Sequence, residues 1–249
     1  MELKKPEIEP GTPKADPKYS ITVMSNGPYL VFGSPQLKQD FISTNNEGEA
    51  WDYKAGKNYT TEKEPTALCR CGASKNKPYC DGSHTTAKWD PTLTAGRGPL
   101  LDNAETYKGP ELELNDNPKY CARARFCMAK NSVWELTGDS DNPQAKETAI
   151  RETFLCPSGR LKIIDREKSE FLEPGLSPSL SLLEDSQMHC SGPLWVKGGI
   201  HIEDEDKKAY ETRNRVSLCR CGASKNKPYC DGSHIEAGFE DGLPVMPEK

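Results

Sequence analysis

Residues 68–84 read LCRCGASKNKPYCDGSH, and residues 218–234 repeat the same seventeen letters 150 positions further along the chain. A weaker similarity precedes each copy, GPYLVFG at 27–33 and GPLWVKG at 192–198. The first copy has 42 residues from its Gly-Pro to its first cysteine, against 27 in the second, which predicts a loop insertion of about 15 residues around Thr44–Lys57. Because two repeats are too few for a solenoid, we expect a pair packed about a pseudo-two-fold axis.

Each copy presents the pattern C-x-C-x8-C-x3-H. The two sets are Cys69, Cys71, Cys80 and His84, and Cys219, Cys221, Cys230 and His234. In an extended segment the two cysteines of C-x-C project to one face, with Cα atoms about 6.6 Å apart, so they can hold one metal centre from the same side. The turn Asp81-Gly82-Ser83 brings His84 back toward that centre.

Three thiolates and one imidazole suit either a tetrahedral zinc ion or an iron–sulfur cluster. Zinc sites usually space their cysteines as C-x2-4-C, so the C-x-C spacing favours iron–sulfur and leaves zinc as the alternative.

Composition and charge exclude several classes of protein. The 249 residues carry a net charge of −5, ten cysteines and four histidines. This balance lacks the basic footprint of a nucleic-acid-binding protein, and no apolar run approaches a membrane span. The first residues, MELKKP, lack the apolar core of a signal peptide, so we expect a cytoplasmic protein whose cysteines bind metal rather than form disulfides.

The segment between the copies has a different character. Glu111–Leu114 alternates as a strand does, and Asn117-Pro118 predicts a helix that runs to Lys130. A second helix is expected from Asn142-Pro143 to about Leu155, and Leu161–Ile164 reads as a closing strand. The fold class is therefore α+β: two β-rich units in a pseudo-two-fold pair, with a small strand–helix–helix–strand unit between them.

Four regions follow from these patterns. They are an extended N-terminal arm at 1–20, a first repeat domain at 21–100, the middle unit at 105–170, and a second repeat domain at 188–249.

The string C-R-C-x2-S-x3-K-P-Y-C-D-G-S-H resembles the signature of the CDGSH iron–sulfur domain family, also called NEET proteins, in both copies. The resemblance covers about 110 of the 249 residues. It implies one [2Fe–2S] cluster per copy, with the C-x-C pair on the inner iron and the later Cys and His on the outer iron. Single-motif members form homodimers with exchanged strands, so the tandem chain looks like that dimer made within one polypeptide, and a monomer is expected.

The middle unit resembles a single-cluster ferredoxin more weakly. Cys121 and Cys127 stand as C-x2-A-x2-C, with Ala124 in the position of a middle cysteine, and Cys156-Pro157 follows remotely. Three thiolates can hold a three-iron cluster, whereas the missing corner argues against four irons. A cluster-free remnant and a regulatory thiol pair are the other readings of these cysteines.

Three functions compete for this sequence. The first is electron transfer or cluster transfer to a redox partner or an apo iron–sulfur acceptor, by a protein that is not an enzyme, binds no nucleic acid and attaches to no membrane. The second is a zinc-binding interaction module. The third, a redox enzyme fed by the clusters, requires an open metal site in the middle unit, and the sequence offers no nucleophile–base pair, phosphate loop or dinucleotide fingerprint.

Overall fold

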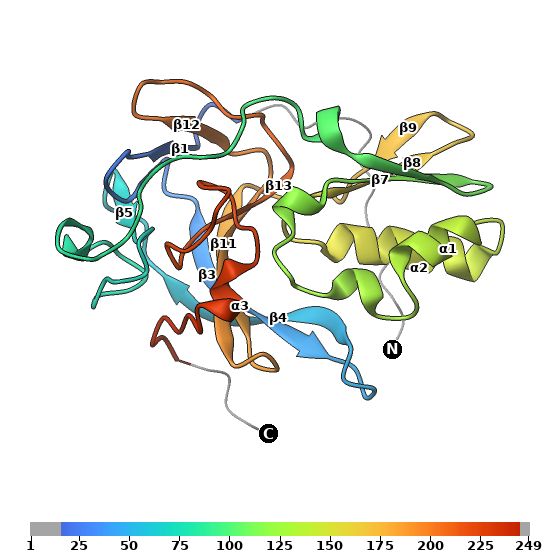
Figure 1. Ribbon diagram of the computed structural model, residues 1–249, viewed down its shortest axis with the longest axis horizontal. Helices are drawn as coiled ribbons and strands as arrows, with labels where there is room; N and C mark the ends of the chain where they lie inside the picture. Colours follow the sequence, from blue (N-terminus) through green and yellow to red (C-terminus); the bar gives the residue numbers. More distant parts are fainter. Residues whose placement is uncertain (1–15, 245–249) are drawn as a thin grey trace.

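The computed structural model describes residues 16–244 as a mixed α+β molecule built mostly of β-sheet (Figure 1). Residues 1–15 of the predicted N-terminal arm and residues 245–249 lie outside the described part. The strands are β1 (Ser20–Val23), β2 (Tyr29–Phe32), β3 (Gln36–Thr44), β4 (Ala50–Tyr59), β5 (Thr66–Leu68), β6 (Glu105–Lys108), β7 (Leu112–Asp116), β8 (Leu161–Asp165), β9 (Glu170–Leu172), β10 (Ser179–Asp185), β11 (Cys190–Lys197), β12 (His201–Asp204) and β13 (Arg215–Leu218). The α-helices are α1 (Val133–Gly138), α2 (Pro143–Leu155) and α3 (Ser233–Glu236). The 3-10 turns are η1 (Ser83–Thr85), η2 (Leu100–Asn103), η3 (Pro118–Tyr120) and η4 (Phe126–Met128).

The two repeats form two sheets that exchange strands: the first repeat contributes β3 and β4 to the second sheet, and the second repeat contributes β12 to the first. The first sheet has the order β12-β1-β2-β5, and the second has the order β13-β11-β10-β3-β4. Strand β12 of the second repeat pairs in parallel with β1, and β3 of the first repeat pairs in parallel with β10. The predicted α+β class and the intramolecular pseudo-two-fold pair are therefore confirmed.

In each repeat a glycine stands where the chain first crosses from one sheet to the other. Gly33 follows β2 with φ 86, and Gly198 follows β11 with φ 73, in the left-handed region that favours glycine. A Cβ atom would lie 2.1 Å from the carbonyl oxygen of Lys18 at the first position, and 2.4 Å from the backbone nitrogen of Pro178 at the second. The final glycine of the GPYLVFG and GPLWVKG echo is thus required by the crossing.

The two sheets share one apolar core. Alternate residues of β1 and β2 point into it, and alternate residues of β10 and β11 enter from the other sheet. The core residues from these four strands are Ile21, Val23, Tyr29, Val31, Leu180, Leu182, Leu194 and Val196, each with at most 2% of its surface exposed. Fully burying each aliphatic side chain stabilises the fold by about 1.5–3 kcal/mol, so neither sheet is complete without the other.

The prediction that the insertion around Thr44–Lys57 is a loop is wrong. Most of these residues belong to a hairpin in which β4 pairs antiparallel with β3, joined by the turn Asn45–Glu49. Strand β4 forms the edge of the second sheet and is mostly exposed, which explains its polar sequence. A strand at the edge of a sheet can be polar on its solvent-facing side, so its sequence resembles that of a loop.

The middle unit has its own sheet and core. Its four antiparallel strands have the order β6-β7-β8-β9, and α1 and α2 pack against them. The predicted strands at 111–114 and 161–164 correspond to β7 and β8, and the predicted helix at 142–155 corresponds to α2, with Asn142 accepting hydrogen bonds from Gln144 and Ala145.

The helix predicted from Asn117-Pro118 to Lys130 is wrong beyond its first turn. Asn117 caps the 3-10 turn η3 and Pro118 opens it, but the turn ends at Tyr120. Arg123 and Arg125 then adopt left-handed backbone angles, φ 54 and φ 66, which an α-helix does not contain.

The first α-helix of the middle unit is instead α1. It begins after Ser132, whose hydroxyl accepts a hydrogen bond from the Glu135 backbone while the Glu135 carboxylate accepts one from Ser132 in return. This capping box is a sequence signal that marks the true helix start.

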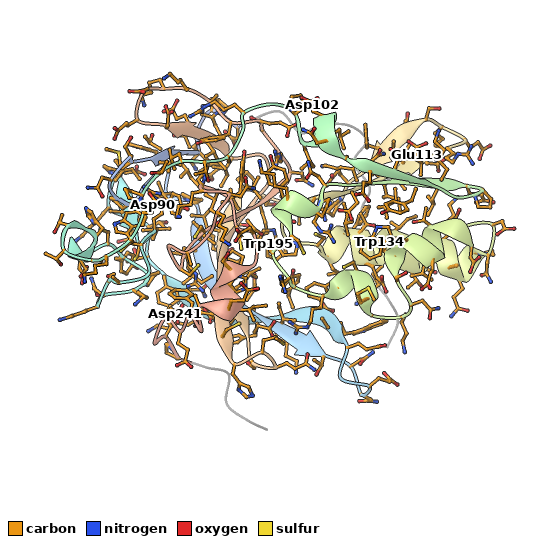
Figure 2. All side chains as sticks on the ribbon, in the orientation of Figure 1. Asp90, Asp102, Glu113, Trp134, Trp195 and Asp241 are labelled. Atoms are coloured by element: carbon orange, nitrogen blue, oxygen red, sulfur yellow. The ribbon has the colours of Figure 1, made fainter. Side chains whose placement is uncertain are left out.

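The middle unit packs beside the second repeat. Figure 1 shows α3 of the second repeat near the centre of the molecule, the middle unit on one side of it, and the η1 region of the first repeat at the opposite edge. In Figure 2, Trp195 lies near the centre and Trp134 lies among the helices of the middle unit. Within residues 16–244, no helix has both the length and the apolar character to span a bilayer.

Candidate metal centres

Both repeated motifs have the same local fold. The backbone N–H of Cys69 donates to the carbonyl of Pro78, and that of Cys80 donates to the carbonyl of Ala67, so the C-x-C segment and the third cysteine lie on adjacent extended segments. The second copy repeats these bonds through Cys219 and Cys230. The first and third cysteines of each copy are therefore fixed by backbone pairing rather than by loop conformation.

A turn returns each histidine to its cysteine, as predicted from Asp81-Gly82-Ser83. The Asp81 carboxylate accepts hydrogen bonds from the backbone of Ser83 at 2.9 Å and Lys75 at 2.8 Å. Gly82 has φ 87 and leads into η1, which carries His84. In the second copy, Gly232 has φ 90 and leads into α3, which carries His234.

Each ligand set divides into two pairs. The Sγ atoms of Cys69 and Cys71 lie 3.8 Å apart, and those of Cys219 and Cys221 lie 3.7 Å apart. The Nδ1 atom of His84 lies 3.4 Å from the Sγ of Cys80, and the corresponding distance between His234 and Cys230 is 3.5 Å.

These spacings match two ligands of one tetrahedral metal. With metal–sulfur bonds of about 2.3 Å and metal–nitrogen bonds of about 2.05 Å, tetrahedral edges are about 3.8 Å for two sulfurs and about 3.6 Å for sulfur and nitrogen. In residues 16–244, no three His, Cys, Asp or Glu side chains converge on a single-ion site. Each copy therefore offers one two-sulfur pair and one sulfur–nitrogen pair, each sized for its own metal atom.

Hydrogen bonds and burial shift the pKa values of the candidate ligands in both directions. Backbone N–H groups of Ala73 and Ala223 each donate to a cysteine Sγ at 3.4 Å. The hydrogen bond between Cys69 and Cys71 lowers the pKa of Cys69 to about 6 and raises that of Cys71. Burial raises the pKa values of Cys80 and Cys230, so these thiols ionise when a metal binds them. Burial, followed by the charge of Arg220, lowers the pKa of His234 to about 4, so this imidazole is neutral and able to ligate at physiological pH.

The two C-x-C segments meet at the pseudo-two-fold axis. Cys71 and Cys221 form an antiparallel backbone bridge with each other. A Cβ on Gly72 would lie 2.6 Å from the carbonyl oxygen of Cys221, and one on Gly222 would lie 2.6 Å from that of Cys71. The glycine after each C-x-C is needed for this close approach, which brings the two candidate centres together.

An open pocket of about 500 Å³ lies beside this junction. It is lined by Cys71 and Cys221, by Trp89 and neighbours from the segment after the first motif, and by the loop at 222–227 of the second motif.

Sequence reasoning missed the arginine inside each C-x-C. Arg70 is 1% exposed and donates to the backbone carbonyls of Met24, Ser25 and Gly27 at 2.7–3.0 Å. Because alternate residues of an extended segment face opposite sides, the residue between two ligands must point away from the metal and into the core. That alternation was the available signal.

Arg220 occupies the equivalent position in the second motif, but its hydrogen-bond partners differ from those of Arg70. It donates to the carboxylates of Asp241 at 2.5 Å and Glu184 at 3.0 Å, and to the carbonyl of Gly192 at 2.9 Å. Burial raises the pKa of Glu184 to about 7 despite the opposing charge of Arg220. The second motif is thus anchored through a buried charge network, whereas Arg70 has no carboxylate partner within residues 16–244.

The middle cysteines gather around an arginine. Arg160 forms a buried ion pair with Asp116, and its Nη2 lies 4.0 Å from the Sγ of Cys127. Burial acts to lower the pKa of Arg160, but the charges of Cys156, Cys121, Asp116 and Cys127 raise it overall. The three thiols therefore share their space with a guanidinium.

The middle unit has no fourth cysteine at the position where a ferredoxin-like site would need one, because Ala124 stands there. Ala124 belongs to a different apolar cluster, with Phe126, Ile42 and Ala50, whereas Cys156 and Cys127 pack with the core of the middle unit. Burial raises the pKa of Cys127 to about 12. These residues do not fit a [4Fe–4S] cluster held by four thiolates.

Comparison with known proteins gives two family matches. The family described as "Iron-binding zinc finger CDGSH type" matches residues 26–85 and 191–235, and the family described as "Divergent 4Fe-4S mono-cluster" matches residues 107–166. A CDGSH iron-sulfur domain-containing protein 2 homolog from Drosophila ananassae is 32% identical over 68 residues. That match covers 25% of this chain, and the chain spans about half, 51%, of the relative's length. No solved structure matches the chain.

Proposed function

We propose that this chain, an iron–sulfur protein with two CDGSH regions around a divergent ferredoxin-like region, binds two [2Fe–2S] clusters and passes electrons or clusters to partner proteins. The ligands would be Cys69, Cys71, Cys80 and His84 in the first centre, and Cys219, Cys221, Cys230 and His234 in the second. When bound, a [2Fe–2S] cluster supplies a one-electron couple whose potential depends on its ligands and surroundings.

The observation that supports two-iron centres best is the division of each ligand set into pairs. A two-sulfur pair at 3.7–3.8 Å and a sulfur–nitrogen pair at 3.4–3.5 Å each have the edge length of one tetrahedral metal atom. A zinc ion held by three cysteines and one histidine requires all four atoms around one point. The pairs therefore favour two metal atoms per centre over one zinc ion.

The chain's own residues stabilise such a centre. Backbone N–H groups directed at sulfur favour the thiolate, and Gly232 N donates to Cys230 Sγ at 3.4 Å. Arg70 places buried positive charge behind the first C-x-C pair, which compensates an anionic centre. The charge of Arg220 behind the second pair is instead balanced by Glu184 and Asp241.

We propose a carrier rather than an enzyme, acting in the cytoplasm as a monomer. Its partner would be a redox protein or an apo iron–sulfur acceptor. The third expected alternative, an enzyme with an open metal site in the middle unit, is disfavoured by the guanidinium of Arg160 among the three thiols.

The test is a visible spectrum of the purified protein with iron, sulfide and zinc counts. We expect a red-brown solution with about four irons and four sulfides per chain, two of each per [2Fe–2S] centre. Cys80→Ser and Cys230→Ser should each remove one centre. A colourless protein with stoichiometric zinc would overturn the proposal and leave the zinc-binding interaction module.

A further inference from the structure

The two motifs are identical in sequence and different in exposure. Cys230 is 3% exposed and His234 is 4% exposed, whereas Cys80 and His84 are half-buried. Asn226, at 3%, is buried, but its counterpart Asn76 is exposed. Because the letters are the same, the difference must come from what packs on each copy.

The segment at 119–125 of the middle unit packs on the second motif. We call this segment the clasp. The carbonyl of Lys119 accepts a hydrogen bond from the Asn226 side chain at 3.3 Å. The rings of Tyr120 and Tyr229 meet edge to face with centroids 5.0 Å apart, and the Arg213 guanidinium lies over both. These contacts cover the loop between the C-x-C pair and the third cysteine.

Two arginines attach the clasp. Arg125 binds the buried carboxylate of Asp185 through both terminal nitrogens, at 2.5 and 3.0 Å. Arg123 lies 3.5 Å from Glu236, at the end of α3, two residues from His234. These two arginines are also the residues whose left-handed backbone angles are incompatible with the predicted helix. The irregular backbone therefore directs their side chains toward the second motif.

The turn glycines give a direct comparison of the copies. A Cβ added at Gly232 would lie 2.5 Å from the Cγ of Arg123. A Cβ added at Gly82 would have no atom of the described residues 16–244 within 4 Å. Arg123 therefore covers the turn that carries the histidine of the second centre, and the equivalent turn of the first centre is open.

A second cover comes from the segment after the first motif. The Thr94 hydroxyl donates to the carbonyl of Lys225 at 2.8 Å, and the Ala95 backbone donates to that of Lys227 at 2.8 Å. The first copy thus sends its own following segment across the second motif. On its own turn, this segment contacts His84 through the Trp89 indole, which donates to the His84 carbonyl at 3.1 Å, and no described residue covers Gly82.

We infer that the clasp encloses the second centre, which the chain retains, and that the first centre, through the open face of His84, is the one that a partner reaches. This assignment rests on the proposed binding of two clusters. It gives the middle unit a role that needs no metal of its own: it makes two chemically identical sites unequal. The partner surface is the turn at Asp81–Thr85, and the partner is an apo iron–sulfur acceptor protein that contacts the outer ligands there.

The test is cluster loss from the holoprotein at a constant pH of about 7.5, about one unit above the ordinary pKa of histidine, so that ligand protonation contributes little. A chelator or an apo [2Fe–2S] acceptor protein is added, and loss is followed by absorbance. We expect two phases of equal amplitude, one fast and one slow. Cys80→Ser, which removes the first centre, should leave only the slow phase, and Cys230→Ser should leave only the fast one.

Gly232→Ala and Gly82→Ala form a matched pair. Both place alanine at a left-handed position in the same sequence, so both carry the same backbone strain. Only Gly232→Ala displaces Arg123. We therefore expect Gly232→Ala to accelerate loss of its own centre by a larger factor than Gly82→Ala accelerates loss of the first.

Arg123→Ser tests the clasp without touching a motif. It should accelerate the slow phase several-fold and leave the fast phase unchanged, which serves as an internal control because general destabilisation would accelerate both. The inference would be wrong if both clusters were lost in a single phase, or if the fast phase disappeared in Cys230→Ser. Either result would leave the proposed binding of two clusters unaffected. A parent protein without clusters would overturn the proposed function itself.

Discussion

At the scale of single residues, the arginine between the paired cysteines has a different role in each copy. Arg70 donates to backbone carbonyls, whereas Arg220 neutralises two buried carboxylates. Replacing Arg220 by Met leaves buried charges without a partner, which costs about 3–5 kcal/mol. Replacing Arg70 by Met leaves buried carbonyl groups without a hydrogen-bond donor, which costs about 1–3 kcal/mol of stability.

Thermal unfolding of the two variants checks this difference. Arg220→Met should lower the melting temperature more than Arg70→Met, although both change the same letter of the same motif. Equal shifts would mean that the buried carboxylates gain nothing from Arg220.

Glu152 should make stability depend on pH. Its side chain is buried, one oxygen accepts a hydrogen bond from the Lys130 backbone at 2.9 Å, and the other has no partner among the described residues. Burial raises its pKa to about 7 from the ordinary value of 4.5. Because the unfolded chain ionises first, stability falls as pH rises from about 4.5 to about 7.

Glu152→Gln removes this ionisation. The stability of the variant relative to the parent should increase by on the order of 2 kcal/mol between pH 5 and pH 8. Denaturant unfolding at the two pH values measures the difference. A constant gap between variant and parent would show that Glu152 does not ionise in this range.

The ligand pattern could be found from spacing alone, because C-x-C and C-x3-H constrain chemistry locally. The different flanking sequences predict that the two copies are not equivalent, but which of His84 and His234 is the more exposed could not be predicted. Seventeen identical letters cannot encode two environments, and the difference lies in Arg123, Arg125 and Thr94, which are distant in sequence.

At the scale of elements, the middle unit keeps its strands and helices while its cysteines surround Arg160. We expect Cys127→Ser to leave the iron and sulfide counts and the redox potentials of the protein unchanged. Iron analysis and a redox titration measure both. Loss of about three or four irons in this variant, the content of a three- or four-iron cluster, would show that the middle unit holds one.

Element boundaries followed local sequence signals only where no tertiary contact opposed them. Asn142-Pro143 combines a cap with a proline at the first helical position, and α2 begins there. Asn117-Pro118 carries the same signal, yet tertiary contacts of Arg123 and Arg125 with the second repeat prevail over helix propensity. The hairpin of β3 and β4 was missed because its edge strand is polar.

At the scale of the whole molecule, the exchanged strands predict a monomer. Strands β3 and β12 already complete the opposite sheets, so the partner that a single-motif protein needs is present within the chain. Sedimentation velocity of the holoprotein should give a single species near the chain mass of 27.6 kDa at all concentrations. An obligate dimer would contradict the prediction.

The same exchange explains why the fold class could be predicted and the register could not. The repeat and its glycines indicate two similar halves, but nothing local in Gln36–Thr44 says which sheet it joins. That choice depends on the shared core, to which both halves contribute.

Joining the halves in one chain also removes a constraint of symmetry. In a homodimer, any substitution that shields one site shields its twin, because both come from the same gene sequence. Here the strands hold two halves together at an effective concentration that dilution cannot lower, so each half is free to accumulate its own neighbours. The backbone bridge between Cys71 and Cys221 then keeps two sites of different accessibility in direct contact. A storage position and a delivery position can thus coexist within one molecule, an arrangement that identical subunits do not permit.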